Sequence, residues 1–479
     1  MKRLILHLAV ALLGLVFAPA ALAGGPAMVV GATEDAVRQP EPVAAKAQMD
    51  LLRLAGLEGV RVTQIWKPGD TAPTAGDLEV LRNVAAAAQL DGVRIVLSVT
   101  NLGSRTTPLT DDDQADFAAY AGAVVAALPS VHEFIVGNEP NLNRYWMPQY
   151  GLDGRDVAAP AYEALLAKAY DAIKAVDPAA LVYGGAVSPR GVDRPNTGRD
   201  THSPTTFIPD MGAAYRASGR TLPIMDGFAF HLYGDNSSQP PGTPHSGTSI
   251  GLGDYDKLVA LLGRAFDGTP QIGTTMPIVY DEYGVETQVP AAKARFYNGR
   301  EPAVTKPVDP ATQGSYYAQA IALTFCQPNV RGLFLFHSVD ETDLDRWQSG
   351  LYYADGTPKL SLAPARAAVL EARRGVVAHC AGLRLPVKAK LDRASARNPR
   401  FSFRLSCDID CTYRGRLEKL PQHSTVMVKR GVAVGSKSLR VAFPARKLAP
   451  GRYRFTVRVA ASVNPGPSRS LFSAAFRIL

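Results

Sequence analysis

The sequence predicts a (β/α)8 barrel followed by a small all-β sandwich. Over the first three quarters of the chain, eight short apolar runs rich in β-branched residues alternate with eight longer, Ala-rich helical stretches. After Cys380 the pattern changes to short segments in which apolar and polar residues alternate, separated by Pro and Gly turns. The first pattern is typical of parallel strands connected by helices, and the second of antiparallel sheets.

The barrel prediction depends on the number and order of these elements. We expect strands at residues 27–32, 60–66, 93–100, 131–136, 181–186, 225–232, 277–282 and 332–337. We expect helices at residues 42–55, 77–89, 111–128, 160–176, 204–217, 252–265, 310–325 and 362–373. Eight such units in about 350 residues match a closed barrel with enlarged loops. A doubly wound sheet would have a Gly-rich phosphate turn after its first strand, and residues 29–34 contain none.

The alternating pattern of the C-terminal part predicts a separate domain. Residues 401–405, 438–443 and 453–459 each show period-two alternation, with one apolar face and one face of Arg, Ser and Thr. About 95 residues of this kind form a small antiparallel sandwich. We therefore expect a barrel domain at residues 24–382 and a basic β-sandwich domain at residues 383–479.

The N-terminus has the order of features found in secretory signals. Lys2 and Arg3 precede an apolar run from Leu4 to Phe17, and a small-residue site ends at Ala23. The apolar run is too short to span a bilayer comfortably. We expect a signal peptide at residues 1–23, a secreted or extracytoplasmic mature protein, and no membrane span after cleavage.

Export changes the interpretation of the four cysteines. An even number of cysteines in an oxidising compartment favours disulfides over metal sites or catalytic thiols, and four cysteines allow three connectivities. Of these we favour Cys326 with Cys380 and Cys407 with Cys411. Neither pair has the further Cys or His at ligand spacing that a zinc site needs, and we expect no metal and no other cofactor.

The net charge of +9 is the average of two very different parts. Residues 383–479 contain 21 Lys and Arg against 4 Asp and Glu, whereas residues 1–382 contain 31 against 39. Two interpretations of the basic part stay open: attraction to an acidic polymer of a cell surface, or charged decoration of exposed strands. Nucleic acid is not an expected partner, because the protein is predicted to be exported and shows no recognised aromatic and basic binding motif.

The ends of the fourth and seventh predicted strands each carry a glutamate. Glu139 follows the strand 131–136 in Gly137-Asn138-Glu139-Pro140-Asn141, and Glu282 ends the strand 277–282. Catalytic side chains of such barrels sit at the C-terminal ends of strands, and strands four and seven lie on opposite sides of the opening. Two facing carboxylates of different pKa are what cleavage of a glycosidic bond requires.

Other polar residues are predicted to serve this pair. Arg61 is expected to point inward on the second strand and to keep Glu282 ionised. His231 and Tyr233, at the end of the sixth strand, are expected to donate hydrogen bonds to Glu282 or to a sugar hydroxyl.

These motifs resemble the clan of retaining glycoside hydrolases that includes the family-5 cellulases and the family-39 β-xylosidases. The resemblance lies in residues 137–141, in Phe-His-Leu-Tyr at 230–233, in Tyr-Asp-Glu-Tyr-Gly at 280–284 and in the closing segment 350–359. It implies that Glu139 is the acid/base, Glu282 the nucleophile and Asn138 the donor to the sugar 2-hydroxyl. Residues 448–455 similarly resemble the late hairpin of fibronectin-like or Ig-like modules.

One departure from the clan concerns the Trp that often ends strand eight and stacks under the sugar. His337 stands at this position and is expected to contact the substrate. The resemblance then leaves Trp347, in the following loop, or Trp66, after strand two, as the sugar platform.

The sequence therefore predicts a retaining glycosidase that acts on a polysaccharide or oligosaccharide. A non-catalytic carbohydrate-binding or surface-attachment protein on the same scaffold remains the alternative, and transglycosylation would use the same two glutamates. A metal-dependent hydrolase is disfavoured, because it would need clustered His and Asp ligands at the strand ends.

Overall fold

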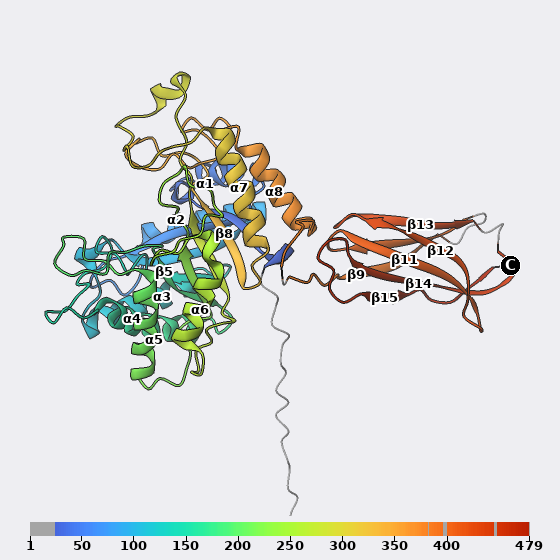
Figure 1. The fold of residues 1–479 in the computed structure, drawn as a ribbon, viewed down its shortest axis with the longest axis horizontal. Helices are drawn as coiled ribbons and strands as arrows, with labels where there is room; N and C mark the ends of the chain where they lie inside the picture. The colour runs from blue at the N-terminus through green and yellow to red at the C-terminus, as the bar shows by residue number, and fades with distance from the viewer. Residues whose placement is uncertain (1–23, 382, 396–399, 445–447, 479) are drawn as a thin grey trace, which may run out of the picture.

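The protein is described by a computed structural model that covers residues 24–381, 383–395, 400–444 and 448–478. The predicted signal peptide, residues 1–23, lies outside the described residues. Two parts follow one another along the chain, a barrel surrounded by helices and an elongated pair of sheets (Figure 1).

Eight parallel strands close into a barrel in the order β1 to β8. They are β1 (Val29–Thr33), β2 (Gly59–Trp66), β3 (Arg94–Asn101), β4 (Glu133–Val136), β5 (Leu181–Val187), β6 (Gly227–His231), β7 (Ile278–Tyr283) and β8 (Val330–Phe336). Each overlaps a strand predicted from the sequence. The closed order confirms the barrel and rules out the doubly wound sheet.

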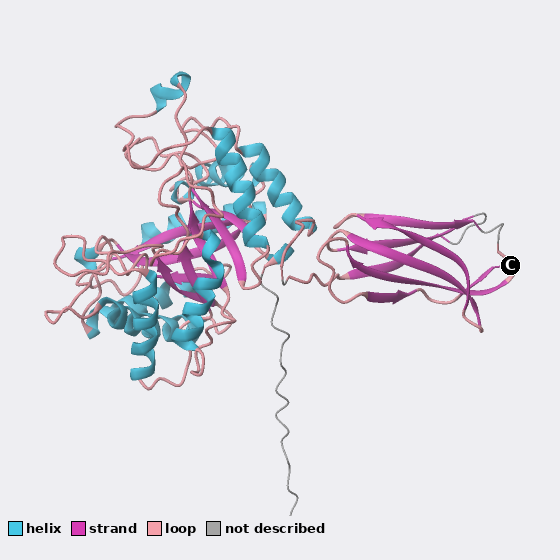
Figure 2. Ribbon diagram, viewed as in Figure 1, coloured by secondary structure: helices cyan, strands magenta, loops and turns pink. Residues whose placement is uncertain are grey.

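A helix follows each strand and covers the outside of the barrel (Figure 2). The helices are α1 (Pro42–Leu54), α2 (Ala75–Asp91), α3 (Asp111–Ala127), α4 (Ala158–Val176), α5 (Pro204–Ala217), α6 (Tyr255–Phe266), α7 (Pro310–Phe325) and α8 (Leu362–Arg374). Short 3-10 helices lie at η1 (Gly25–Ala27), η2 (Asp35–Val37), η3 (Ser104–Thr106), η4 (Leu252–Asp254) and η5 (Ala291–Phe296). Thr74 and Thr110 begin α2 and α3 with capping boxes.

The strands pack apolar side chains in two layers. One set joins the helices in the main core, and a second cluster consists of Val29, Val96, Ile135, Tyr183, Ala186, Ala229, Val279 and Phe334. These eight side chains come from seven different strands and pack against one another, as expected for a filled barrel interior. Because the interior is filled, polar chemistry is confined to the end of the barrel where the βα loops converge.

The C-terminal part consists of two antiparallel sheets. One has the order β13-β10-β9 and the other the order β12-β11-β14-β15, with β16 paired to β14. The strands are β9 (Ala389–Ser395), β10 (Arg400–Cys407), β11 (Cys411–Leu420), β12 (Ser424–Ala433), β13 (Ser438–Pro444), β14 (Gly451–Ala461), β15 (Arg469–Phe472) and β16 (Phe476–Ile478). Phe403 of one sheet stacks on Phe455 of the other with ring centroids 4.7 Å apart, so the sheets share an aromatic core.

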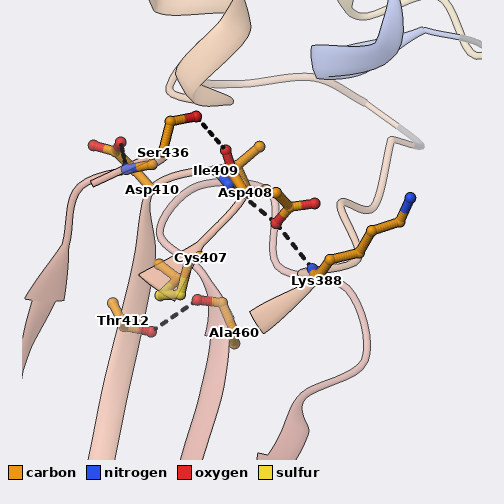
Figure 3. The surroundings of a disulfide bond; sticks show 10 residues. Lys388, Cys407, Asp408, Ile409, Asp410, Thr412, Ser436 and Ala460 are labelled. Atoms are coloured by element: carbon orange, nitrogen blue, oxygen red, sulfur yellow. Dashed lines mark hydrogen bonds between the residues drawn. A yellow bond between two sulfur atoms is a disulfide. The ribbon is translucent and has the colours of Figure 1, made fainter. Parts of the chain in front are cut away.

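Both predicted disulfides are present. Cys326, directly after α7, is bonded to Cys380, beyond α8. Cys407 and Cys411 join the end of β10 to the start of β11, and so connect the two sheets (Figure 3). In the turn between them Asp408 accepts hydrogen bonds from the backbone N–H groups of Lys388 and Ile409, which orders the crossing.

The end of α8 contacts the same turn. Arg374 makes an ion pair with Asp410 at 2.7 Å, and the Asp410 N–H donates to the Arg374 carbonyl.

Within the described ranges, no helix has both the length and the apolar character needed to cross a membrane.

Candidate active site

A tight turn after β4 presents Asn138 and Glu139 at the barrel opening. Gly137 has φ 86°, and Glu139 itself has φ 42°, a left-handed conformation that is uncommon for a residue with a side chain. The Glu139 N–H donates to the Ala186 carbonyl at 2.8 Å, which ties this turn to the end of β5. The backbone conformation of Glu139 is therefore determined by the neighbouring strand.

Asp281 and Glu282 are consecutive in β7, yet both contact the same group. In a regular strand their side chains would point to opposite faces. The pairing of β7 with β6 and with β8 is irregular here, and this bulge turns both carboxylates toward the barrel opening. Asp281 is fully buried and Glu282 is 8% exposed.

His231, at the end of β6, brings the carboxylates together. Its Nδ1 lies 2.9 Å from Glu139 Oε1 and 3.3 Å from Glu282 Oε2, while its Nε2 lies 3.3 Å from Asp281 Oδ2. Because Glu139 and Glu282 approach the same nitrogen, their nearest oxygens are separated by no more than the sum of those first two distances. The two predicted catalytic glutamates thus face one another.

Two further donors hold Glu282. Arg61 Nη1 lies 3.2 Å from Glu282 Oε1, and the Tyr233 hydroxyl donates to Glu282 Oε2 at 2.7 Å. Arg61 Nη2 also donates to Asn138 Oδ1 at 3.0 Å, which leaves the Asn138 amide nitrogen for another acceptor. Glu282 is therefore fixed on both of its oxygens.

The electrostatics of the cluster reflect burial opposed by mutual attraction. Burial raises the pKa of Glu282, and the charges of His231 and Arg61 oppose that rise. Burial lowers the pKa of His231, but the carboxylates of Glu282 and Asp281 outweigh it and hold that pKa well above the ordinary value. The pKa of Asp281 is lowered, because His231 and Arg61 outweigh its burial. The cluster therefore favours an imidazolium between carboxylates.

Glu139 and Glu282 open into a cleft of about 360 Å³. It is lined by Glu139, Arg144, Tyr145, Ser188, Pro189, Arg190, Tyr233, Gly234, Asp235, Asn236, Ser237, Glu282, Gly284, Glu286, Val304, Thr305, Phe336 and Trp347. The ring centroid of Trp347 lies 4.7 Å from that of Tyr233 and 5.2 Å from that of Phe336. This aromatic wall stands directly beside Glu282, and it suits the apolar face of a sugar.

Two predicted site residues lie elsewhere. Trp66 is fully buried, packs edge-on against Phe117 and donates its indole N–H to the Asp70 carbonyl. Its place at the end of β2 turns it into the helical layer, so it offers no surface to a sugar.

His337 lies beside a different cavity. Its Nδ1 is 3.8 Å from Glu34 and its Nε2 is 3.6 Å from Glu341. The left-handed backbone at His337, with φ 72°, directs its ring toward these carboxylates, and Phe336 takes the place in the cleft instead.

Sequence reasoning missed Asp281, Phe336 and Arg190 as site residues. Period-two alternation puts Asp281 on the inward side of β7 with Val279, and Phe336 on the inward side of β8 with Phe334, so their places near the strand ends were a signal that could have found both. Arg190 reaches the cleft from the β5–α5 loop and donates to the carbonyls of Tyr233 and Gly234. The sequence marks Arg190 only as a basic residue shortly after the fifth predicted strand.

In the described segments no three His, Cys, Asp or Glu side chains are grouped to hold a metal ion.

Comparisons with known proteins identify the fold. No protein-family model matches the chain, and no curated protein matches its sequence. Among solved structures, a glucosidase from Croceicoccus marinus matches with a TM-score of 0.52 and 12% identity, over 88% of this chain and 94% of that one. A GH5_18 protein from Streptomyces cattleya, solved with GlcNAc, matches with a TM-score of 0.50 and 17% identity, over 74% and 81% of the two chains.

This chain has the barrel fold of those glycoside hydrolases. The resemblance inferred from the strand-end motifs is thus confirmed at the level of the fold. At these identities the likeness is one of architecture, and the chemistry is argued from the site itself.

Proposed function

We propose that the protein is a secreted retaining glycoside hydrolase that acts on a polysaccharide or oligosaccharide. One observation carries the proposal: Glu139 and Glu282 come from opposite sides of the barrel and approach the same nitrogen of His231 within 3.3 Å. Retaining enzymes need two carboxyl groups about 5 to 5.5 Å apart, whereas inverting enzymes need about 6.5 to 9.5 Å to admit a water. The closeness of both glutamates to one nitrogen of His231 favours the retaining geometry.

In the first step Glu282 attacks the anomeric carbon and forms a glycosyl ester. The bond to the leaving oxygen breaks, and Glu139 gives that oxygen its proton. Arg61 and Tyr233 keep the attacking carboxylate ionised and oriented, and Asn138 is placed to donate its amide N–H to the 2-hydroxyl. Trp347 and Phe336 support the sugar ring in the cleft.

In the second step the carboxylate of Glu139 removes a proton from water. The water oxygen attacks the anomeric carbon, the ester bond to Glu282 breaks, and both carboxyl groups return to their first state. A sugar hydroxyl in place of water would give transglycosylation by the same residues.

The test compares two alanine variants on aryl glycosides with good and poor leaving groups. Glu282→Ala should abolish turnover of both kinds, because no other group can form the ester. Glu139→Ala should retain turnover of the activated substrates and lose the others by about 100-fold or more, since only poor leaving groups need the proton. Product anomers are followed by NMR, and retention is expected.

Glu41→Gln is a suitable control, because Glu41 is exposed and its side chain makes no capping hydrogen bond. Equal losses on both substrate classes for Glu139→Ala would contradict its role. If the unmodified protein binds glycans but hydrolyses none of a broad panel, the non-catalytic alternative replaces the proposal.

We also propose export and attachment. Two disulfides and the leader-like N-terminus support an oxidising, extracytoplasmic location. The excess of 21 basic over 4 acidic residues in positions 383–479 supports retention on an acidic polymer of a cell surface. Retention that falls with added salt is the expected result, measured by cosedimentation of the protein with cell-wall material.

A further inference from the structure

The two outer faces of the C-terminal sandwich differ in how their charges are arranged. In β14 the side chains of Tyr453, Phe455 and Val457 are buried in the sandwich, and residues between them face outward. The same alternation in β11 buries Leu417 and exposes Arg416. The outer face of the five-stranded sheet is therefore made by a defined set of residues from β12, β11 and β14.

Three arginines of this face lie side by side, and we call them the arginine row. Arg414 of β11 is paired in register with Arg430 of β12 on one side and with Arg458 of β14 on the other. All three are exposed. With strands about 4.8 Å apart the row spans roughly 10 Å. Arg416 adds a fourth positive charge two residues along β11.

The arginine row has no anionic partner within the described part of the protein. The acidic residues of this domain that form ion pairs do so with Arg374, Lys390 and His423. Arg458 Nε donates to the Ser468 hydroxyl, which is neutral. Like charges directly opposite one another destabilise a sheet. A row of three therefore carries a cost that an external anion would remove.

The other outer face is also basic, but a carboxylate lies in register with its arginines. On the three-stranded sheet Arg404 is paired with Arg440 on one side, but with Asp392 on the other. A general surplus of basic residues explains this face, where the carboxylate of Asp392 lies between positive charges. The same surplus does not explain the arginine row, in which three arginines are in register with no carboxylate among them.

Apolar side chains flank the arginine row. Val432 lies beyond it on β12, and Val428 and Phe472 lie in the next row, with Arg416 between them. Their exposed fractions are 56%, 43% and 63% respectively. The surface thus combines guanidinium groups, which bind carboxylates in a bidentate manner, with apolar contacts suited to the C–H faces of sugar rings.

We propose that the arginine row is the site at which the C-terminal domain binds an acidic polysaccharide. This site is where the attachment proposed above would take place, and its assignment rests in part on that proposal. Successive acidic groups of an extended chain would lie across β12, β11 and β14, with a sugar ring over Val428 or Phe472. The site is separate from the catalytic cleft, none of whose lining residues comes from this domain.

The test uses the full-length protein and immobilised polygalacturonate, with neutral dextran as the reference polymer. Arg414→Gln, Arg430→Gln and Arg458→Gln are combined in one variant. The matched control combines Arg404→Gln, Arg440→Gln and Lys390→Gln, which removes the same charge from the outer face of the three-stranded sheet. Binding is measured by biolayer interferometry over a range of salt concentrations, and thermal melts establish that both variants fold.

We expect the arginine-row variant to lose affinity for polygalacturonate by about tenfold or more, and the control to change by less than about twofold. Equal losses in both variants would overturn the site, because binding would then follow total charge. Retained binding by the arginine-row variant would overturn the site as well, because the polymer would then bind through another surface.

Two further outcomes bear on the partner. Absence of polygalacturonate binding by the unmodified protein would overturn both the site and its partner. Binding to phosphatidylglycerol vesicles with none to polygalacturonate would assign the row to a membrane and overturn the polysaccharide. Turnover of a small aryl glycoside by the same variants reports on the proposed hydrolase separately, and it should not change.

Discussion

Glu282 makes hydrogen bonds or ion pairs with three different side chains, and each one acts on its charge. Tyr233 and Arg61 bind opposite carboxylate oxygens, and His231 lies 3.3 Å from the oxygen that Tyr233 contacts. Burial raises the pKa of Glu282, so the ionised form of this proposed nucleophile depends on these donors. Positioning and ionisation of Glu282 thus have the same structural origin.

Tyr233→Phe tests this dependence. The substitution removes one hydrogen bond to the ionised form, so the pKa of Glu282 should rise further and the acidic limb of kcat/KM should move to higher pH. A shift of about one pH unit corresponds to the strength of one charge-assisted hydrogen bond. A full pH profile of the variant is compared with that of Tyr150→Phe, which alters a tyrosine outside the cleft. Lower kcat with an unmoved acidic limb would contradict the argument.

Glu34 is the other carboxylate on which the barrel depends. It follows β1 and accepts hydrogen bonds from Ser338 N–H, Ser338 Oγ and Ala36 N–H, so it connects the first strand to the turn after the last. Burial by itself would raise its pKa, but the nearby charge of His337 and the backbone N–H groups of Ala36 and Ser338 together outweigh burial and lower it to about 2. His337, predicted to contact the substrate, lies instead beside Glu34.

Glu34→Gln should therefore destabilise the protein in a pH-dependent manner. The folded-state pKa is depressed, so the stabilisation is fully present above the unfolded value of 4.5 and is lost as the pH falls toward 2. The expected loss at pH 7 is about 3 kcal/mol, and it should shrink below pH 4.5. Urea unfolding at pH 7, 4 and 3 measures it, with Glu41→Gln as the reference. A loss that stays constant with pH would show that Glu34 acts through packing alone.

At the scale of elements, one irregular strand and one tight turn create the site. The bulge in β7 turns Asp281 and Glu282 to the same side, and the turn after β4 places Glu139 in a left-handed conformation. The strands themselves were predictable, because eight apolar runs separated by helical segments have few other arrangements. The irregularities were not, since they arise from pairing with neighbours that are distant in sequence.

The two disulfides close loops of very different length. Cys326 and Cys380 are separated by 54 positions and bracket α8, whereas Cys407 and Cys411 are separated by 4. Loop-closure entropy predicts a loss of about 4 kcal/mol when the first is replaced by serines and about 2 kcal/mol for the second. Chemical denaturation of the two double-serine variants measures both losses. A larger loss for the short loop would mean that the crossing between the sheets matters more than chain entropy.

At the scale of the whole molecule, chemistry and attachment are assigned to separate parts. Every residue that lines the cleft precedes residue 348. Specific polar contacts join the parts: Arg374 pairs with Asp410, and Asn464 donates to the Val377 carbonyl. The C-terminal part therefore contacts the end of α8 without reaching the proposed catalytic cluster.

A chain that ends at residue 382 should keep its turnover of small aryl glycosides within about twofold, because the cleft is intact. Its melting temperature should fall, since Arg374 and the Val377 carbonyl lose their partners. Binding to polygalacturonate should disappear. Activity, melting and binding assays on the truncated and full-length chains test the three expectations together, and loss of activity from a folded truncated chain would show that the two parts cooperate in catalysis.

The sequence by itself determined the barrel, the β domain and the pair of strand-end glutamates, because hydrophobic periodicity and the position of a charge after an apolar strand are local signals. Among three possible disulfide connectivities it favoured the one that the structure contains. Only the tertiary structure decided which side chains meet. Phe336 and Trp347 form the wall of the cleft while Trp66 is buried and His337 holds Glu34, and Arg414 faces Arg430 and Arg458 across three strands. These outcomes depend on strand register, bulges and left-handed turns, which are set by contacts between residues far apart in the chain.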